Sequence, residues 1–313
     1  YLLGWMEQVY MERDERDYSP EGIYRNMFLP ALYAAYFEGD PEHRAKKKEI
    51  MGLMYRRMTK YVRRMPDNQP SESTQKNLLA CLNSFVEYPD GILEKDFILE
   101  LVACRNPDGY VSSRMAAEIG VMLTELAGAL GCRDGQEAAA RREELRAFVY
   151  EGCMLHNVGV MSFQHFVRRI GRSWLEEEKE MYQCHVYSGE VMLSQSESTR
   201  PYRWAALGHH RFYDGSGGYP EEYCREADPN PMLTDLISAA VHLVRLLDDR
   251  MHLTSRPLSL EEALTQIRAD GGTRLAPHWA RLLCELEPRL RVYLKDGQAK
   301  AYEEVFALLR LRE

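Results

Sequence analysis

Apolar residues recur every three or four positions along most of the chain, which is the spacing of an amphipathic α-helix. The clearest of these segments run from 115 to 130, from about 136 to 155, from about 175 to 193 and from about 233 to 247. A further helix is expected after Ser259, because a serine before an apolar-periodic segment is a common helix cap. Strand-like alternation of apolar and polar residues is hard to find. The pattern therefore predicts an all-α fold.

Two polar segments interrupt this pattern. The first spans 66–71, and the second is Asn106-Pro107-Asp108-Gly109, a combination typical of a loop. We place a domain boundary at the second segment. The sequence then predicts an N-terminal helical region over 1–105, with an unknown sensory or dimerisation role, and a second domain over 106–313.

Charge and cysteine content exclude some function classes. The net charge is −8, so the chain as a whole has no electrostatic attraction for nucleic acid, and we expect no nucleic-acid partner. The longest apolar run, from Met27 to Phe37, is too short to span a bilayer, so no membrane segment is expected in this chain. Seven cysteines without a CxxC pair are typical of free thiols, which favours a cytoplasmic location.

The histidines are unevenly distributed. Five of the nine lie between 156 and 210, and Asp248 follows at the end of a predicted helix. A single histidine on an apolar helix face is usually a hydrogen-bonded core residue. The adjacent pair His209 and His210 differs, because burying two imidazoles without partners is costly. Imidazoles and carboxylates from separate helices can bind a divalent cation in a helical bundle, so this cluster predicts a metal site.

A glycine-rich turn follows the histidine pair in the string HHRFYDGSGGYP, from His209 to Pro220. Glycine has no Cβ, so the backbone N–H groups between Asp214 and Gly218 can approach a phosphate closely. A tight surface loop is the alternative interpretation.

This string resembles the signature HHxxxDGxGYP of the HD-GYP subgroup of the HD superfamily. Further motifs match in the same order: HNVGV at 156–160 resembles HDxGK, and HVYSGEVML at 185–193 resembles HxxxGxxIL. The segment 242–257 resembles RIxxVADxYDALTSxRP, and the later SLEEAL and GGTRLAP resemble the closing helices of the family. The resemblance covers about 108–283, and several ordered motifs are more specific than any one of them.

The resemblance implies an HD-superfamily helical bundle that hydrolyses cyclic di-GMP with divalent Fe, Mn or another transition metal. The residues that match the metal ligands of the family are His156, His185, His209, His210 and Asp248, with Asp249 as a one-residue alternative for the last. The residues that match its substrate and partner loop are Asp214, Gly215, Gly217, Gly218, Tyr219 and Pro220. The implied partners are a cyclic dinucleotide or other phosphoester ligand, a signalling protein at this loop, and a second copy of the chain.

Three positions depart from the family pattern. Asn157 replaces the aspartate that bridges two metals, Val160 replaces a lysine, and Val111 stands where an upstream histidine is expected. The loop also has one extra glycine, either Gly217 or Gly218. A neutral amide oxygen is a poor bridge between two cations.

We therefore expect at most one well-bound metal, held by His185, His209 and His210, with Asn157 as a weak fourth ligand. No residue is assigned a certain catalytic role, and weak or lost phosphodiesterase activity is expected. Two alternatives remain. One is a catalytically inactive regulatory or scaffold module that binds nucleotide or protein, which Asn157 and Val160 favour over a fully active enzyme. The other is an HD-type phosphohydrolase acting on a different nucleotide, which the DGSGGYP loop disfavours.

Overall fold

The computed structural model describes residues 106–130, 136–162, 174–194, 197–248 and 257–310, together with five residues between 95 and 103. Every regular element within these ranges is helical, and the only strand-like pairs there are two isolated bridges, Arg211 with Gly218 and Gly271 with Leu275. The predicted all-α class is confirmed. Nearly all of the N-terminal region 1–105 lies outside the described residues, so the domain division at 105/106 stays a prediction.

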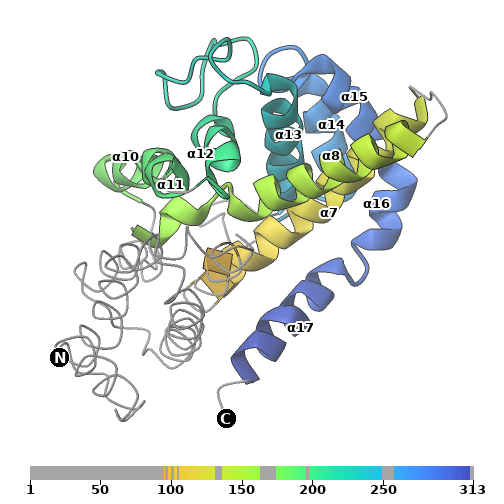
Figure 1. The fold of residues 1–313 in the computed structure, drawn as a ribbon, viewed down its shortest axis with the longest axis horizontal. Coiled ribbons are helices and arrows are strands. Elements are labelled where there is room, and N and C mark those ends of the chain that lie inside the picture. The colour runs from red at the N-terminus through yellow and green to blue at the C-terminus, as the bar shows by residue number, and fades with distance from the viewer. Residues whose placement is uncertain are drawn as a thin grey trace, which may run out of the picture.

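The two longest helices form the centre of the described fold. Helix α7 (Pro107–Leu130) and helix α8 (Gln136–Leu155) lie side by side, and α13 (Pro231–Leu247) packs against both (Figure 1). Ile119 and Leu123 of α7, Val149 of α8 and Ile237 of α13 are all fully buried in the core. At Gly120, an added Cβ would lie 2.7 Å from Val149, so a residue without a side chain allows the two long helices to approach closely.

Shorter helices surround this centre. Near the C-terminal end of α8 lie η3 (Val158–Ser162), α10 (Glu176–Gln183), α11 (His185–Ser194), η4 (Arg200–Tyr202) and α12 (Arg203–Gly208). The chain after α13 forms α14 (Leu260–Asp270), α15 (Pro277–Glu285), α16 (Glu287–Tyr293) and α17 (Gly297–Arg310). Helix α17 packs against α7, where the guanidinium of Arg114 pairs with Glu304 at 3.0 Å.

Helix boundaries agree with the sequence pattern in some places and differ in others. The segment predicted from about 136 to 155 is α8, and Ser259 caps α14 in a reciprocal arrangement with Glu262, as predicted. The segment from about 175 to 193 is not one helix but two, because the chain turns at Cys184 between α10 and α11. This turn places His185 at the start of its own helix.

The segment from Asn106 to Gly109 is a helix start and not the predicted loop. Helix α7 begins at Pro107, a residue favoured in the first helical position because it needs no N–H partner there. The side chain of Asn106 accepts a hydrogen bond from the N–H of Gly109 at 3.1 Å, as a helix cap does. Asn, Pro, Asp and Gly favour helix starts as well as turns, so the sequence alone did not distinguish the helix start from a loop.

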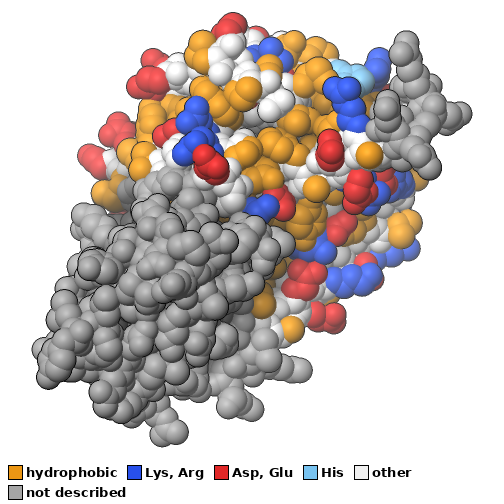
Figure 2. Space-filling model, viewed as in Figure 1, with side chains coloured by type: hydrophobic (Ala, Val, Ile, Leu, Met, Phe, Trp, Pro, Cys, Tyr) orange, Lys and Arg blue, Asp and Glu red, His pale blue; other side chains and the backbone are white. Residues whose placement is uncertain are grey.

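The described surface is mixed in character. None of the described helices is long and apolar enough to cross a membrane. Figure 2 shows Lys and Arg side chains interspersed with Asp and Glu over the described part of the face in view.

Candidate metal centre

Three histidines from two separate elements meet in one place. His185 begins α11, and His209 and His210 follow the end of α12. One ligand nitrogen from each lies within 4.8 Å of the others. Among the described residues, this is the one group of three or more His, Cys, Asp or Glu side chains with ligand atoms this close. The fold therefore brings together the three histidines expected on the better-preserved side of the metal site.

Backbone carbonyls fix which nitrogen faces the centre in two of the three rings. The Nδ1 of His185 lies 2.6 Å from the carbonyl oxygen of Tyr182, and that of His209 lies 2.9 Å from the carbonyl oxygen of Ala206. A carbonyl oxygen only accepts, so each Nδ1 carries the proton and each Nε2 keeps a lone pair. These two Nε2 atoms are 3.4 Å apart. Facing lone pairs repel unless a cation or proton lies between them, and this is how metal-binding histidines are usually oriented.

Burial keeps these imidazoles neutral. Desolvation lowers the pKa of His185 to about 4, and desolvation together with the neighbouring histidines lowers the pKa values of His209 and His210 well below the ordinary value. Near neutral pH the three rings are therefore neutral, and those of His185 and His209 are unprotonated at Nε2. Metal ligands must be deprotonated. Because these imidazoles are already neutral, a cation would not have to displace protons from them.

His156 and Asn157 lie next to this group. Burial lowers the pKa of His156 to about 4, and its ring meets that of His209 edge-on, with 4.8 Å between centroids. The side-chain oxygen of Asn157 is buried and has no hydrogen-bond partner in the described part of the chain. Buried polar atoms normally find a partner, and an amide oxygen can ligate a cation. Three imidazoles fit a divalent transition metal better than magnesium.

Asp248 is placed differently from the three histidines. It ends α13, is buried, and accepts a hydrogen bond from the hydroxyl of Ser112 in α7 at 2.6 Å. Asp248 is not part of the three-histidine group, so its role as a ligand stays a prediction, and Asp249 lies outside the described residues. Val111 is fully buried in the core. The α7 side chain that reaches Asp248 is therefore its neighbour Ser112, which the sequence motifs did not indicate.

The glycine-rich loop is held by Arg211. Its guanidinium donates hydrogen bonds to the carbonyl oxygens of Gly215, Gly217 and Gly218 at 2.8, 3.1 and 3.3 Å. Gly218 has a φ of +73°, and an added Cβ there would collide with the carbonyl oxygen of His210. Gly217 has no positive φ, which fits Gly217 as the extra glycine.

Three of the five backbone donors from Asp214 to Gly218 that were expected to cradle a phosphate already have partners in the protein. The N–H of Asp214 donates to the carbonyl of Thr273, that of Gly215 to the carbonyl of Phe212, and that of Ser216 to the side chain of Asp214. The loop therefore does not offer a ring of free donors, in contrast to the sequence-based expectation.

Aromatic side chains cover the histidine group. The ring of Tyr219 lies 4.5 Å from that of His210, and the ring of Tyr182 lies 4.7 Å from that of His185. Pro220, next to Tyr219, is buried. Tyr182 carries no motif, so sequence analysis missed it, although it stands three residues before His185. Val160, at the position of the family lysine, is only 4% exposed and forms part of the core.

Comparison with known proteins does not assign this chain to a family. No known family profile matches the chain, and no curated protein sequence does. Among solved structures, the chain is similar to an HDG"Y"P protein from Bdellovibrio bacteriovorus, with a TM-score of 0.40 and 15% identity over 86% of this chain and 78% of that one. A likeness this distant assigns neither a family nor an activity.

Proposed function

We propose that this chain is a degenerate HD-GYP-type protein that binds one divalent transition metal and acts on cyclic di-GMP with weak or no hydrolysis. The supporting observation is the group of His185, His209 and His210, whose ligand nitrogens lie within 4.8 Å of one another. These are the residues at which two separate sequence motifs match the family pattern. The buried side-chain oxygen of Asn157, which has no hydrogen-bond partner in the described part of the chain, is a fourth candidate ligand.

The residues of the chain would hold and orient the reacting groups, and a bound cation would supply the chemistry. When bound, a divalent cation supplies charge that stabilises a phosphate and lowers the pKa of a coordinated water. The carbonyls of Tyr182 and Ala206 hold two of the imidazoles in the orientation needed for binding. Tyr219 covers His210 and limits access of solvent to it.

Low activity follows from the substituted positions. Two-metal hydrolysis needs a negatively charged bridge, and the amide of Asn157 is neutral. Val160 is buried and uncharged, so it contributes nothing to neutralising a phosphate. We therefore propose slow turnover, with a regulatory module that binds the dinucleotide without hydrolysing it as the second candidate. Cytoplasmic location, dimerisation and a signalling partner at the loop remain proposals of the same kind.

One experiment on a single sample separates these candidates. Binding of cyclic di-GMP is measured by calorimetry, and formation of the linear dinucleotide by chromatography, after loading with Mn²⁺ or Fe²⁺. We expect binding with slow hydrolysis that His209→Ala abolishes and His278→Ala, an exposed control on α15, preserves. Binding without hydrolysis would favour the regulatory module. Failure to bind the dinucleotide would refute both, and rapid hydrolysis would refute the degenerate character.

A further inference from the structure

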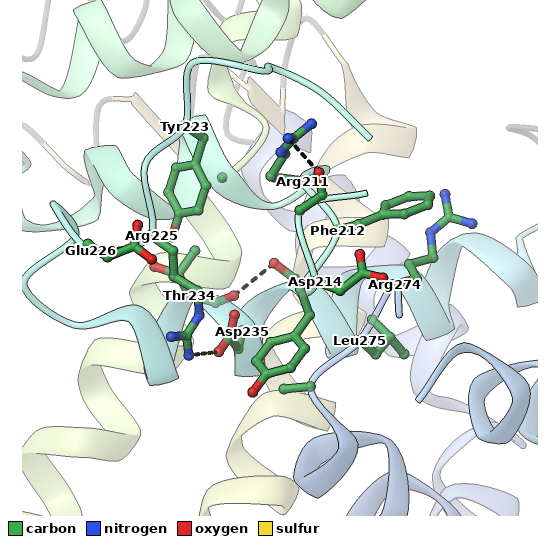
Figure 3. Close-up of a pocket in the computed structure, with 15 residues that line it drawn as sticks. Arg211, Phe212, Asp214, Tyr223, Arg225, Glu226, Thr234, Asp235, Arg274 and Leu275 are labelled. Atoms are coloured by element: carbon green, nitrogen blue, oxygen red, sulfur yellow. Dashed lines mark hydrogen bonds and ion pairs between the residues drawn. The ribbon is translucent and has the colours of Figure 1, made fainter. Parts of the chain in front are cut away.

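A cavity of about 180 Å³ lies under the glycine-rich loop (Figure 3). One wall is the loop from Arg211 to Gly215, another is α13, and a third is the segment 274–276 after α14. Gly208, directly before His209, also lines the cavity, so this space begins beside the histidine group. A cavity of about 150 Å³ holds one benzene ring. The space under the loop therefore has room for one heteroaromatic ring system.

The charged side chains that line this cavity balance one another. Three are basic and three are acidic: Arg211, Arg225, Arg274, Asp214, Glu226 and Asp235. The guanidinium of Arg211 is already bonded to carbonyl oxygens of the loop, and the carboxylate of Asp270 acts on Arg274. A cavity without excess charge of either sign favours a neutral polar group over a phosphate or an ammonium ion.

Asp235 provides a hydrogen-bond acceptor within this lining. Its side chain is only 11% exposed, and one of its carboxylate oxygens accepts a hydrogen bond from the guanidinium of Arg225 at 2.6 Å. The pair is drawn in Figure 3. In the described part of the chain this carboxylate has no second hydrogen-bond partner. Because Asp235 lines the cavity, its other oxygen can accept a hydrogen bond from a ligand there.

Aromatic rings complete the lining. They belong to Phe212, Tyr213 and Tyr223. The guanidinium of Arg225 lies 5.2 Å from the centre of the Tyr213 ring, and that of Arg274 lies 4.8 Å from the centre of the Phe212 ring. Aromatic rings and guanidinium planes are the surfaces on which proteins stack nucleobases, and a carboxylate oxygen accepts from the amino group of a base. Size, charge and lining thus all suit a nucleobase.

We propose that this cavity is a subsite for the base of a nucleotide ligand, and that the second carboxylate oxygen of Asp235 accepts a hydrogen bond from an amino group on that base. The identity of the base as guanine rests on the proposed function. Recognition of a base by this cavity requires neither a metal nor a phosphate. A nucleotide held through its base would lie next to the histidine group, because Gly208 adjoins both.

Guanosine and inosine test this subsite, because inosine lacks only the 2-amino group and neither nucleoside carries a phosphate. Their binding to the full chain is measured by ligand-observed NMR, and folding of each variant is checked by circular dichroism. The native chain is expected to bind guanosine about tenfold more tightly, because inosine loses a hydrogen bond to a charged acceptor. In Asp235→Asn this preference should fall to about threefold, since hydrogen bonds to charged groups are about twice as strong as neutral ones.

Glu285→Gln is the matched control. It removes the carboxylate of an exposed ion pair with Arg281 on α15, away from the cavity lining, so the tenfold preference should be retained. Equal binding of guanosine and inosine by the native chain, or binding of neither, would overturn the proposal. An unchanged preference in Asp235→Asn would overturn it too. The comparison in the native chain needs no variant, so it decides the matter even if Asp235→Asn fails to fold.

The outcomes also separate this subsite from the proposed function. The expected preference for guanosine supports the subsite even where cyclic di-GMP is not hydrolysed and no metal is bound. Binding of cyclic di-GMP by a chain that does not prefer guanosine over inosine would overturn the subsite alone and leave the metal centre intact.

Discussion

Gly159 is the point at which η3 touches the backbone of α11, the helix that carries His185. An added Cβ at Gly159 would lie 2.5 Å from the backbone nitrogen of Gly189 and still closer to the carbonyl oxygen of His185. Real Cβ atoms essentially never approach within 3.0 Å. Both obstructing atoms belong to the backbone, so no change of side-chain rotamer relieves the contact. Gly159→Ala must therefore move α11 away from η3.

The cost can be worked out from this geometry. The contact with Gly189 alone must widen from 2.5 to 3.0 Å, and that with the carbonyl of His185 by more. Overpacking a core costs about 1–3 kcal/mol, and with only backbone movement available we expect about 3 kcal/mol, a factor of about 150 in the folding equilibrium. The same movement displaces His185 from His209. Changes that disturb the orientation of a ligand reduce metal affinity by about tenfold to a hundredfold.

Urea unfolding followed by circular dichroism, and titration with Mn²⁺, measure the two effects. Gly128→Ala in α7 is the matched control, because its Cβ would meet nothing nearer than the side chain of Arg142 at 3.4 Å. Its stability is expected to be unchanged or raised by up to about 1 kcal/mol. If Gly159→Ala were as stable as the native chain and bound metal equally well, the packing of η3 on α11 described above would be wrong.

Three further predictions concern single positions. Asn157→Asp should raise the metal content toward two ions per chain and increase hydrolysis of cyclic di-GMP; no increase in either would show that the missing bridge is not limiting. Val160→Lys should lower the free energy of unfolding by more than about 2 kcal/mol in urea, because the site is 4% exposed and a lysine there would be desolvated; native-like stability would contradict this. His242 has its pKa lowered by burial to about 4, below the usual value of 6.5, so the unfolded chain binds its proton more tightly and stability falls as the pH drops below 6.5. Between pH 8 and pH 5, the free energy of unfolding of His242→Asn should therefore fall by about 2 kcal/mol less than that of the native chain. An equal fall in the two proteins would contradict the effect of burial on the pKa of His242.

Local sequence signals predicted the elements whose causes are local. The apolar spacing predicted α8, and the side chain of Ser259 predicted the start of α14. The turn at Cys184 was missed because the apolar spacing continues across it. Pro107 was assigned to a loop because the residues around it favour a turn as well as a helix start.

In the candidate site too, the sequence indicated the residues that lie in local motifs and missed the contacts between distant segments. Motif resemblance indicated His185, His209 and His210, and the fold brings them together. The pairing of Ser112 with Asp248 joins residues 136 positions apart, and no local pattern encodes it.

Elemental analysis of the purified chain tests the central claim most directly. After loading with Mn²⁺ or Fe²⁺ and removal of the excess, we predict one ion per native chain, loss of that ion in His209→Ala, and its retention in His278→Ala. Two or more ions per native chain would contradict the single-metal site, and no ion at all would contradict metal binding by these histidines.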